Sequence, residues 1–320
     1  SPTCLTTGDR LLISQTGNTN DFHTYCGKGT FSLQSQSNKM LIELHIPYNT
    51  LGGRFYCTLY TILKPTPPPT CECGWKKESR IVNGQETGVN EYPMMAGIVD
   101  GEIRELICGG TIISNRYVLT AAHCLVNRIP ANVGVLIGEH NIATGTETNS
   151  TKLLRAELLI GHPDYDSATQ INDIALIKVV SYIYYSPEVG PACLPFRYPN
   201  SPPVGDIVTV LGWGTIEQAG AKSDVLLKTQ LDVKDIAMCQ EVFGNETVSN
   251  NQICTFRSGT DACQADSGGP VLYEGNRVWL EGVISYGKGC AIQYPSINTR
   301  VGHYLQWILQ SASEETFCVR

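Results

Sequence analysis

Short runs of alternating apolar and polar residues recur along most of this 320-residue chain, separated by glycine, proline, asparagine and serine. In the first part, Ile42, Leu44 and Ile46 alternate with polar neighbours, the period-two pattern of a strand with one buried face. From residue 81 onward the same kind of run recurs in RELICGGTIIS, RYVLTAA, VGVLIG, DIALIKV, DIVTVLGWG, VWLEGVIS and INTRV. A helical pattern occurs only near residues 304–310. The chain is therefore predicted to be all-β with a short C-terminal helix.

A proline-rich stretch divides the chain. Residues 64–70 read KPTPPPT, and such a sequence favours an extended polyproline segment that acts as a spacer. We therefore expect four parts. They are a small β module at 1–63, a linker segment at 64–80, a large β domain at 81–312 and a C-terminal tail at 313–320.

Composition and charge narrow the function classes. The formal net charge is -7, and no basic cluster is longer than Lys76-Lys77, which argues against a nucleic-acid partner. No apolar run reaches the ~18 residues of a membrane span. Thirteen scattered cysteines predict disulfides and an oxidising compartment, and Asn149 and Asn245 begin glycosylation sequons. We expect a secreted, extracellular protein with no membrane partner.

Three short motifs carry candidate chemistry. Ser267 lies in TDACQADSGGP, His123 in TAAHC and Asp173 at the start of the apolar run NDIALIKV. Taken alone, each has a plain structural interpretation as a turn, a cap or a packed histidine. Together they supply a nucleophile, a base to accept its proton and a carboxylate to orient the base, which is the set that acyl transfer by serine requires.

The region from residue 81 to about 312 resembles the chymotrypsin family of serine peptidases. The resemblance rests on IVNG, CGGTIIS, TAAHC, NDIAL, GWG, DACQADSGGP and SYGKGC. It implies two antiparallel six-stranded Greek-key β-barrels with the active site between them. It also implies that Ser267 is the nucleophile, that His123 is the general base and then acid, and that Asp173 orients the imidazole.

The resemblance assigns further roles near the nucleophile. The amides of Ala265 and Ser267 would form the oxyanion hole, although the family usually has glycine where Ala265 stands. Because a β-carbon disfavours the required backbone conformation, Ala265 could be tolerated or could leave the hole partly unformed. Asp261 matches the base of a pocket that selects arginine or lysine.

The wall of that pocket is assigned in the same way. Ser285 and Gly287 would hydrogen bond to the substrate backbone. Ser296 stands where the family usually has glycine, so the pocket would be shallower or more polar than in digestive trypsins.

The same resemblance implies that the chain is a zymogen. Cleavage between Arg80 and Ile81 by a trypsin-like activating protease would free the Ile81 amine. That ammonium would turn inward and pair with the carboxylate of Asp266, which would be costly to bury without a partner.

Disulfide pairs are implied as well. They are Cys108–Cys124, Cys239–Cys254 and Cys263–Cys290, with Cys193 tethering the linker through Cys71 or Cys73 and the remaining linker cysteine reaching Cys318. After activation, such a tether would keep the N-terminal module attached.

Residues 1–63 resemble the second half of a CUB domain, in which Cys4 bridges Cys26. The first half is absent from this sequence, so Cys57 is expected to lack its partner. The layout resembles that of CUB-bearing arthropod proteases of haemolymph, saliva or venom, and it suggests a targeted extracellular role rather than bulk digestion.

No cofactor and no metal are predicted. The loop GEHNIATGTE, with Glu139 and Glu147, resembles the calcium loop of some trypsins, but a solvated loop is the preferred interpretation. The expected partners are protein or peptide substrates, the activating protease and protein inhibitors. The competing hypothesis is a catalytically weak or inactive homologue that acts as a binding cofactor through its CUB-like module.

Overall fold

The computed structural model describes residues 8–26, 33, 39–47, 57, 71–77 and 86–319, apart from 146, 198, 201, 216–220, 259–265 and 289–293. Among the residues to which a role was assigned, those outside the described ranges are Cys4, Arg80, Ile81, Asp261, Cys263, Ala265 and Cys290. The chain divides into two compact units, residues 1–61 and 62–320.

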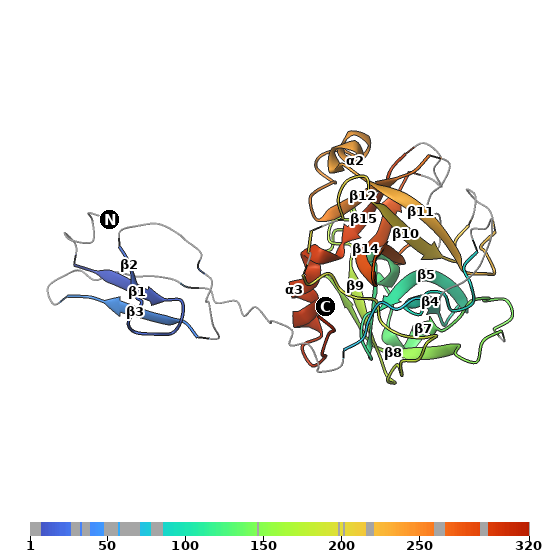
Figure 1. The fold of residues 1–320 in the computed structure, drawn as a ribbon, viewed down its shortest axis with the longest axis horizontal. Coiled ribbons are helices and arrows are strands. Elements are labelled where there is room, and N and C mark those ends of the chain that lie inside the picture. Colours follow the sequence, from blue (N-terminus) through green and yellow to red (C-terminus); the bar gives the residue numbers. More distant parts are fainter. Residues whose placement is uncertain are drawn as a thin grey trace. The chain divides into compact units, whose positions relative to one another are not determined.

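The N-terminal unit contains a three-stranded antiparallel sheet (Figure 1). Its strands are β1 (Arg10–Ser14), β2 (His23–Tyr25) and β3 (Leu41–His45), in the order β2-β1-β3. The strand expected around Ile42 is present, and Ile42 pairs with the buried Ile13 of β1. The expected burial of its apolar side is not found among the described residues. Leu44 and Ile46 remain 37% and 47% exposed.

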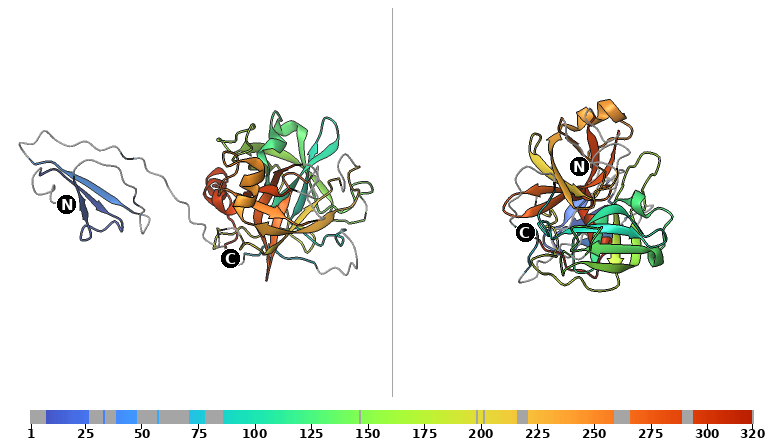
Figure 2. Two further views of the ribbon diagram at one scale, coloured as in Figure 1. Left: turned by 90° about the horizontal axis from the view of Figure 1, so that it is seen from above. Right: turned by 90° about the vertical axis from the view of Figure 1, so that its right-hand side faces the viewer.

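The second unit consists mainly of two closed six-stranded antiparallel barrels, which confirms the predicted fold class (Figures 1 and 2). The first barrel has the order β4-β5-β6-β9-β8-β7, formed by β4 (Met95–Asp100), β5 (Glu105–Ile112), β6 (Tyr117–Thr120), β7 (Val133–Ile137), β8 (Lys152–Gly161) and β9 (Ala175–Val179). The second has the order β10-β11-β12-β15-β14-β13, formed by β10 (Ile207–Gly212), β11 (Leu227–Lys234), β12 (Gln252–Phe256), β13 (Pro270–Glu274), β14 (Val278–Gly287) and β15 (Ser296–Arg300). Closure leaves no free sheet edge in either barrel.

The two barrels meet through backbone that carries no side chains. A β-carbon on Gly109 of β5 would lie 2.7 Å from the Cα of Gly269, just before β13. Gly268 has φ 78°, and a β-carbon there would overlap the hydroxyl of Thr120 at the end of β6. The glycines of the CGG and SGG motifs are therefore required by this close approach. It brings the segment that carries Ser267 against the strand that precedes His123.

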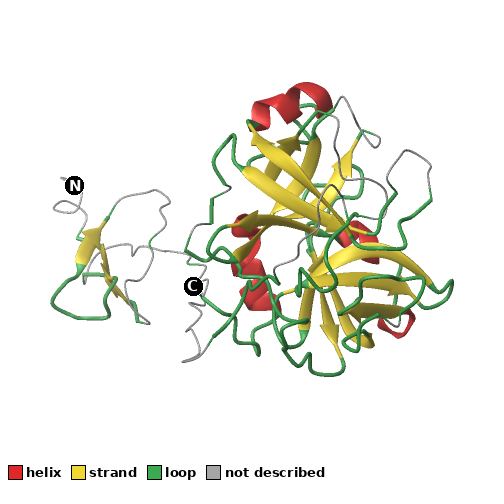
Figure 3. Cartoon of the chain, turned by 45° about the vertical axis from the view of Figure 1, so that its right-hand side comes forward, coloured by secondary structure: helices red, strands yellow, loops and turns green. Residues whose placement is uncertain are grey.

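Helices are few among the described residues (Figure 3). The predicted C-terminal helix is α3 (Val301–Ser311), which buries Tyr304, Leu305 and Ile308 against the barrels. The expectation that helix is confined to the end was wrong, because α2 (Ile236–Phe243) follows β11. This helix has only eight residues and buries only Cys239, so its apolar periodicity is weak. No helix among the described residues is long and apolar enough to cross a membrane.

Both ends of the second unit pack against the barrels. The backbone of Gly74 donates to Pro191 O (2.7 Å) and accepts from Val278 N (2.8 Å). Residues 313–319, expected to be a tail, are held through the buried Phe317 and through Glu314, which pairs with Lys178 at 2.7 Å. Segment 71–77 and the C-terminal end are thus parts of the second unit.

Candidate active site

His123 lies on a short 3-10 helix, η1 (Ala122–Leu125), which begins two residues after β6. Two contacts fix this turn. Cys124 is disulfide-bonded to Cys108 of β5. The Arg128 side chain donates from Nε to the carbonyl of Cys124 (2.9 Å) and forms an ion pair with Asp100. These contacts hold the turn that carries the imidazole in place. A quarter of the His123 side-chain surface is exposed.

Asp173 is fully buried just before β9. Its Oδ2 lies 2.7 Å from Nδ1 of His123, and its Oδ1 accepts from the backbone N–H of His123 at 2.9 Å. The Asp173 carbonyl accepts from the hydroxyl of Thr299 (2.8 Å), and the preceding Asn172 accepts from Tyr304 (2.8 Å). Because Nδ1 donates to the carboxylate, Nε2 is left with the lone pair that a general base needs.

Ser285 supplies another donor to the same carboxylate. The pairing of β14 with β15 shifts register between Ile284 and Tyr286, which marks a β-bulge at Ser285. The bulge aims the buried Ser285 hydroxyl at Oδ2 of Asp173, at 2.5 Å. Sequence reasoning assigned Ser285 to substrate binding and missed this contact with Asp173.

Ser267 lies in the turn that connects Asp266 to β13. Its carbonyl accepts from Gly109 N (2.8 Å) and lies 3.8 Å from Sγ of Cys124, the neighbour of His123. No hydrogen bond joins the Ser267 hydroxyl to His123 among the described contacts. The structure thus brings Ser267, His123 and Asp173 to the same junction between the barrels, with the imidazole oriented by Asp173.

Residues 81–308 match the family model described as "Trypsin". The chain belongs to the trypsin family of serine peptidases. This trypsin-family peptidase is 44% identical over 302 residues to "Venom serine protease 34" of Apis mellifera, covering 92% of this chain and 73% of the relative. It is 41% identical over 254 residues to "Venom serine protease" of Polistes dominula, covering 78% of this chain and 91% of the relative.

"Phenoloxidase-activating factor 3" of Holotrichia diomphalia is 34% identical over 267 residues, covering 76% of each chain. The alignment with the Apis relative is longer than the region 81–320, so it also includes part of the N-terminal region. The family match does not reach residues 1–80. The CUB-like interpretation of the N-terminal module therefore stays a prediction.

The described part of the predicted pocket wall is formed where β14 and β15 pair. Gly287 lies opposite Ser296, and a β-carbon on Gly287 would lie 3.3 Å from the hydroxyl oxygen of Ser296. Ser296 is 6% exposed, so it adds a buried hydroxyl beside the Gly287 backbone. The pocket residue Asp261 and the oxyanion residue Ala265 lie outside the described residues.

Asp266 lies beside the GWG motif. Its Oδ1 accepts from Gly214 N at 2.9 Å, and a β-carbon on Gly212 would overlap the carboxylate. Gly212 therefore makes room for this side chain, and Gly214 donates to it from its backbone, one residue before the nucleophile candidate. The expected partner of Asp266, the amine of Ile81, lies outside the described residues.

Among the described residues of the second unit, four disulfides are present: Cys71–Cys318, Cys73–Cys193, Cys108–Cys124 and Cys239–Cys254. They resolve the alternative that the resemblance left open, because Cys73 bonds Cys193 and Cys71 bonds Cys318. Cys26 is disulfide-bonded and Cys57 is an exposed free thiol. The predicted pair Cys263–Cys290 and the residue Cys4 lie outside the described residues.

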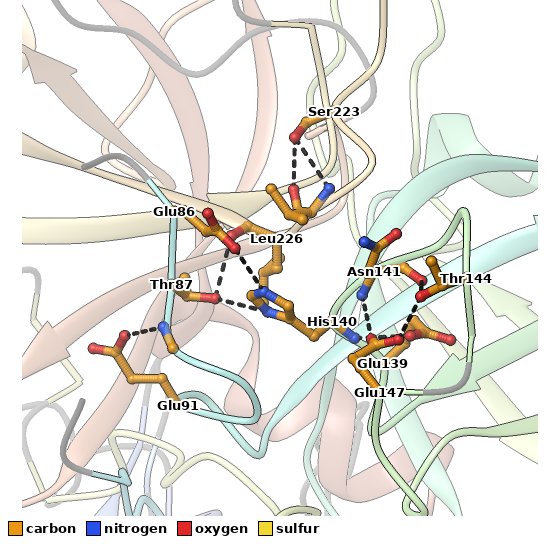
Figure 4. A network of polar contacts seen from close by, with 12 residues as sticks. Glu86, Thr87, Glu91, Glu139, His140, Asn141, Thr144, Glu147, Ser223 and Leu226 are labelled. Carbon is orange, nitrogen blue, oxygen red and sulfur yellow. Dashed lines mark hydrogen bonds and ion pairs between the residues drawn. The ribbon is translucent and has the colours of Figure 1, made fainter. Parts of the chain in front are cut away.

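The loop that carries Glu139 and Glu147 is held by its own hydrogen bonds (Figure 4). Glu147 accepts from Asn141 N (2.6 Å) and from the Thr144 hydroxyl (2.7 Å). Burial, and a hydrogen bond that the Glu139 carboxyl donates to Glu147, raise the pKa of Glu139. Partial burial would raise the pKa of Glu147, but the donors of Thr144 and Asn141 lower it to about 2. Each Glu147 oxygen thus accepts a hydrogen bond from within the loop.

Another group with metal-ligand chemistry is found among the described residues, consisting of His123, Cys108 and Cys124. The two sulfurs form a disulfide and are not thiolate ligands. The sequon residues Asn149 and Asn245 are both exposed, and their glycosylation stays a prediction.

Proposed function

We propose that this protein is a secreted serine endopeptidase zymogen that, once cleaved between Arg80 and Ile81, hydrolyses peptide bonds after arginine or lysine. The observation that carries the catalytic assignment is the buried Asp173, whose two oxygens hold His123 through its backbone and its ring. With Nδ1 held by Asp173, Nε2 is the nitrogen that would accept the proton of Ser267.

In this proposal, Ser267 Oγ attacks the carbonyl carbon of the substrate while its proton passes to Nε2 of His123. The negative charge that develops on the carbonyl oxygen is stabilised by the amides of Ser267 and Ala265. The imidazolium, paired with Asp173, then gives its proton to the leaving amine as the C–N bond breaks. A water molecule repeats the sequence on the acyl-enzyme and restores Ser267.

Specificity is assigned to Asp261 with support from the pocket wall. A carboxylate at the base of a pocket pairs with an arginine or lysine side chain, and a pocket built for that charge rejects uncharged residues. The buried hydroxyl of Ser296 beside Gly287 makes the pocket wall more polar than a glycine would.

The geometry around Glu86 supports the activation step. Glu86 bridges Leu227 of β11, and Leu227 pairs with Gly212 of β10, against which Asp266 packs. With strands ~4.8 Å apart, Glu86 lies about 10 Å from Gly212. The segment 81–85 can span up to ~17 Å when extended. A freed Ile81 amine therefore has enough chain to reach Asp266.

Secretion is part of the proposal. It is supported by the disulfides of the second unit and by the names of the two relatives described as venom serine proteases.

The test is trypsin treatment of the purified zymogen, followed by hydrolysis of matched peptides that end in Arg, Lys, Phe or Leu. We expect activity to appear on Arg and Lys peptides only after cleavage at Arg80. The variants Arg80→Gln and Ser267→Ala should stay inactive, and only the cleaved wild type should be labelled by a serine phosphonate. A cleaved protein that is neither labelled nor active would favour the binding-cofactor hypothesis, and a Phe or Leu preference would refute the pocket assignment.

A further inference from the structure

A buried ion cluster joins three segments of the second unit around Glu91. The Glu91 side chain is only 2% exposed. Its Oε1 lies 2.7 Å from Nζ of Lys228 on β11 and 3.2 Å from Nζ of Lys76. A buried carboxylate is tolerated when cations satisfy it, and removal of one partner is strongly destabilising. One of these two cations comes from segment 71–77, which precedes the proposed activation bond.

Lys76 is held from several sides. Its ammonium lies 2.7 Å from Oε2 of Glu274, donates to the hydroxyl of Tyr92 (3.1 Å) and lies 4.8 Å from the centre of the Tyr92 ring. The Tyr92 hydroxyl in turn donates to Oε1 of Glu274 at 2.8 Å. The next residue, Lys77, donates from its backbone N–H to the carbonyl of Glu91 (3.0 Å). The position of Lys76 is therefore fixed by the second barrel and by the 91–92 segment together.

The second oxygen of Glu91 holds the turn that precedes it in the sequence. Oε2 accepts from the N–H of Gly88 at 2.8 Å, and Glu91 N donates back to the Gly88 carbonyl at 3.0 Å. Figure 4 shows this contact beside Thr87, whose N–H and hydroxyl both donate to Leu226 O. Glu86, the next residue toward Ile81, bonds the buried His140 at 3.0 Å. Glu91 thus connects Lys76 to the base of the segment that carries Ile81.

We propose that Lys76 and Glu91 are positioning residues for the active conformation, an inference that rests on the proposed pairing of Ile81 with Asp266. In this proposal, segment 71–77 stays bound after cleavage and helps to hold the active conformation. Without Lys76, Glu91 loses one of its two described cations, and the Gly88–Glu91 turn loosens. The Ile81 tail gains freedom, and its ammonium pairs less well with Asp266.

The alkaline side of the pH–rate profile reports this pairing. A free α-amino group has a pKa of about 8, and pairing with a carboxylate raises it. Activity is therefore present below the raised pKa and is lost as the pH rises through it. If the equilibrium constant for the pairing of Ile81 with Asp266 falls about tenfold, the pH at which activity is lost falls by about one unit. A loss of folding stability alone does not change that pH.

The experiment compares fully cleaved wild type, Lys76→Met, Lys77→Met and Lys76→Arg on an arginine peptide from pH 6 to 10. Lys77 is the matched control, because its exposed side chain makes no described contact. We expect Lys76→Met to lose activity about one pH unit earlier than wild type. Lys77→Met should be unchanged, and Lys76→Arg should recover most of the shift.

The double variant Lys76→Met with Glu91→Gln removes the cation and the buried charge together, and it tests the cluster even if Lys76→Met does not fold. If both variants fold, the double variant should lose activity at a pH closer to that of wild type than Lys76→Met does. If only the double variant folds, it should lose activity at a different pH from Lys77→Met. Profiles that coincide for all the variants would overturn the inference. Cleaved wild type without activity on Arg or Lys peptides would instead defeat the proposed function.

Discussion

At the scale of single residues, the carboxylate of Asp173 depends on groups that lie far apart in the sequence. His123 contributes two donors and Ser285 a third, and the Thr299 hydroxyl holds the Asp173 backbone. Ser285 comes from the second barrel, whereas Asp173 and His123 come from the first. The orientation of the base is therefore a property of the junction between the barrels.

We predict that Ser285→Ala lowers kcat by about tenfold with little change in KM. The variant removes one donor to a buried carboxylate, and a hydrogen bond to a charged group contributes ~1.5 to 3 kcal/mol. Steady-state kinetics on an arginine peptide measure the effect. Ser186→Ala is the control, because that hydroxyl accepts from Glu188 N in a surface turn. A rise in KM with unchanged kcat would assign the Ser285 hydroxyl to substrate binding instead.

The motifs were sufficient to identify Ser267, His123 and Asp173 as candidates, because each stands in a short and specific run. The contact between Ser285 and Asp173 could not be read in this way. It spans 112 positions and depends on a bulge in β14. The cluster at Glu91 is a similar case, since Lys76 and Glu274 are separated by 198 positions. Such pairings follow from barrel closure, which no local pattern encodes.

At the scale of elements, the β14 strand carries a second unusual residue, Glu281. It is 6% exposed, and its Oε2 has no hydrogen-bond partner. Burial raises the pKa of this carboxyl to about 8, so it is protonated at neutral pH. The alternation of apolar residues in VWLEGVIS predicted the strand. That run did not predict which side Glu281 would face, and the closed barrel buries it.

We predict that Glu281 makes folding stability fall as the pH rises from about 4.5 to about 8. In this window the folded state keeps a proton that the unfolded state has lost, so stability decreases by up to ~1.4 kcal/mol per pH unit. Glu281→Gln should remove this dependence, as measured by the free energy of unfolding at pH 5, 6.5 and 8. The exposed Glu241→Gln serves as control. Parallel pH profiles for wild type and Glu281→Gln would contradict the assignment.

The strands of the barrels and the helix α2 differ in how well the sequence pattern predicts them. Seven strands of the two barrels lie mainly in the apolar runs that predicted strands, namely β5, β6, β7, β9, β10, β14 and β15. The helix α2 was missed because its stability comes from the Asp235 cap, which accepts from Ala237 N at 2.9 Å, and from the Cys239–Cys254 disulfide. Neither contribution produces a 3.6-residue apolar period.

At the scale of the whole molecule, covalent links define what activation can and cannot release. Cleavage after Arg80 would separate residues 1–80 from 81–320 along the chain, but two disulfides cross the cut, Cys71–Cys318 and Cys73–Cys193. The first reaches the C-terminal end, and the second reaches the connection between the barrels. Segment 71–77 is also held by hydrogen bonds from Gly74 to Pro191 and from Val278 to Gly74. The N-terminal unit would therefore remain part of the active enzyme.

This arrangement predicts a stepwise result when the two disulfides are removed. After cleavage and thiol alkylation, wild type should migrate as one species without reductant and as two chains with it. Replacing Cys73 and Cys193 by Ser should leave the chains joined through Cys71–Cys318, and only the additional loss of Cys71 and Cys318 should separate them under denaturing conditions. Removal of Cys239 and Cys254, which lie on the same side of the cut, is the control and should release nothing. Separation after the loss of a single pair would show that the other disulfide does not form in solution.

Because the quadruple variant loses the covalent link but keeps the Gly74 and Lys76 contacts, gel filtration without denaturant should still find the two chains together.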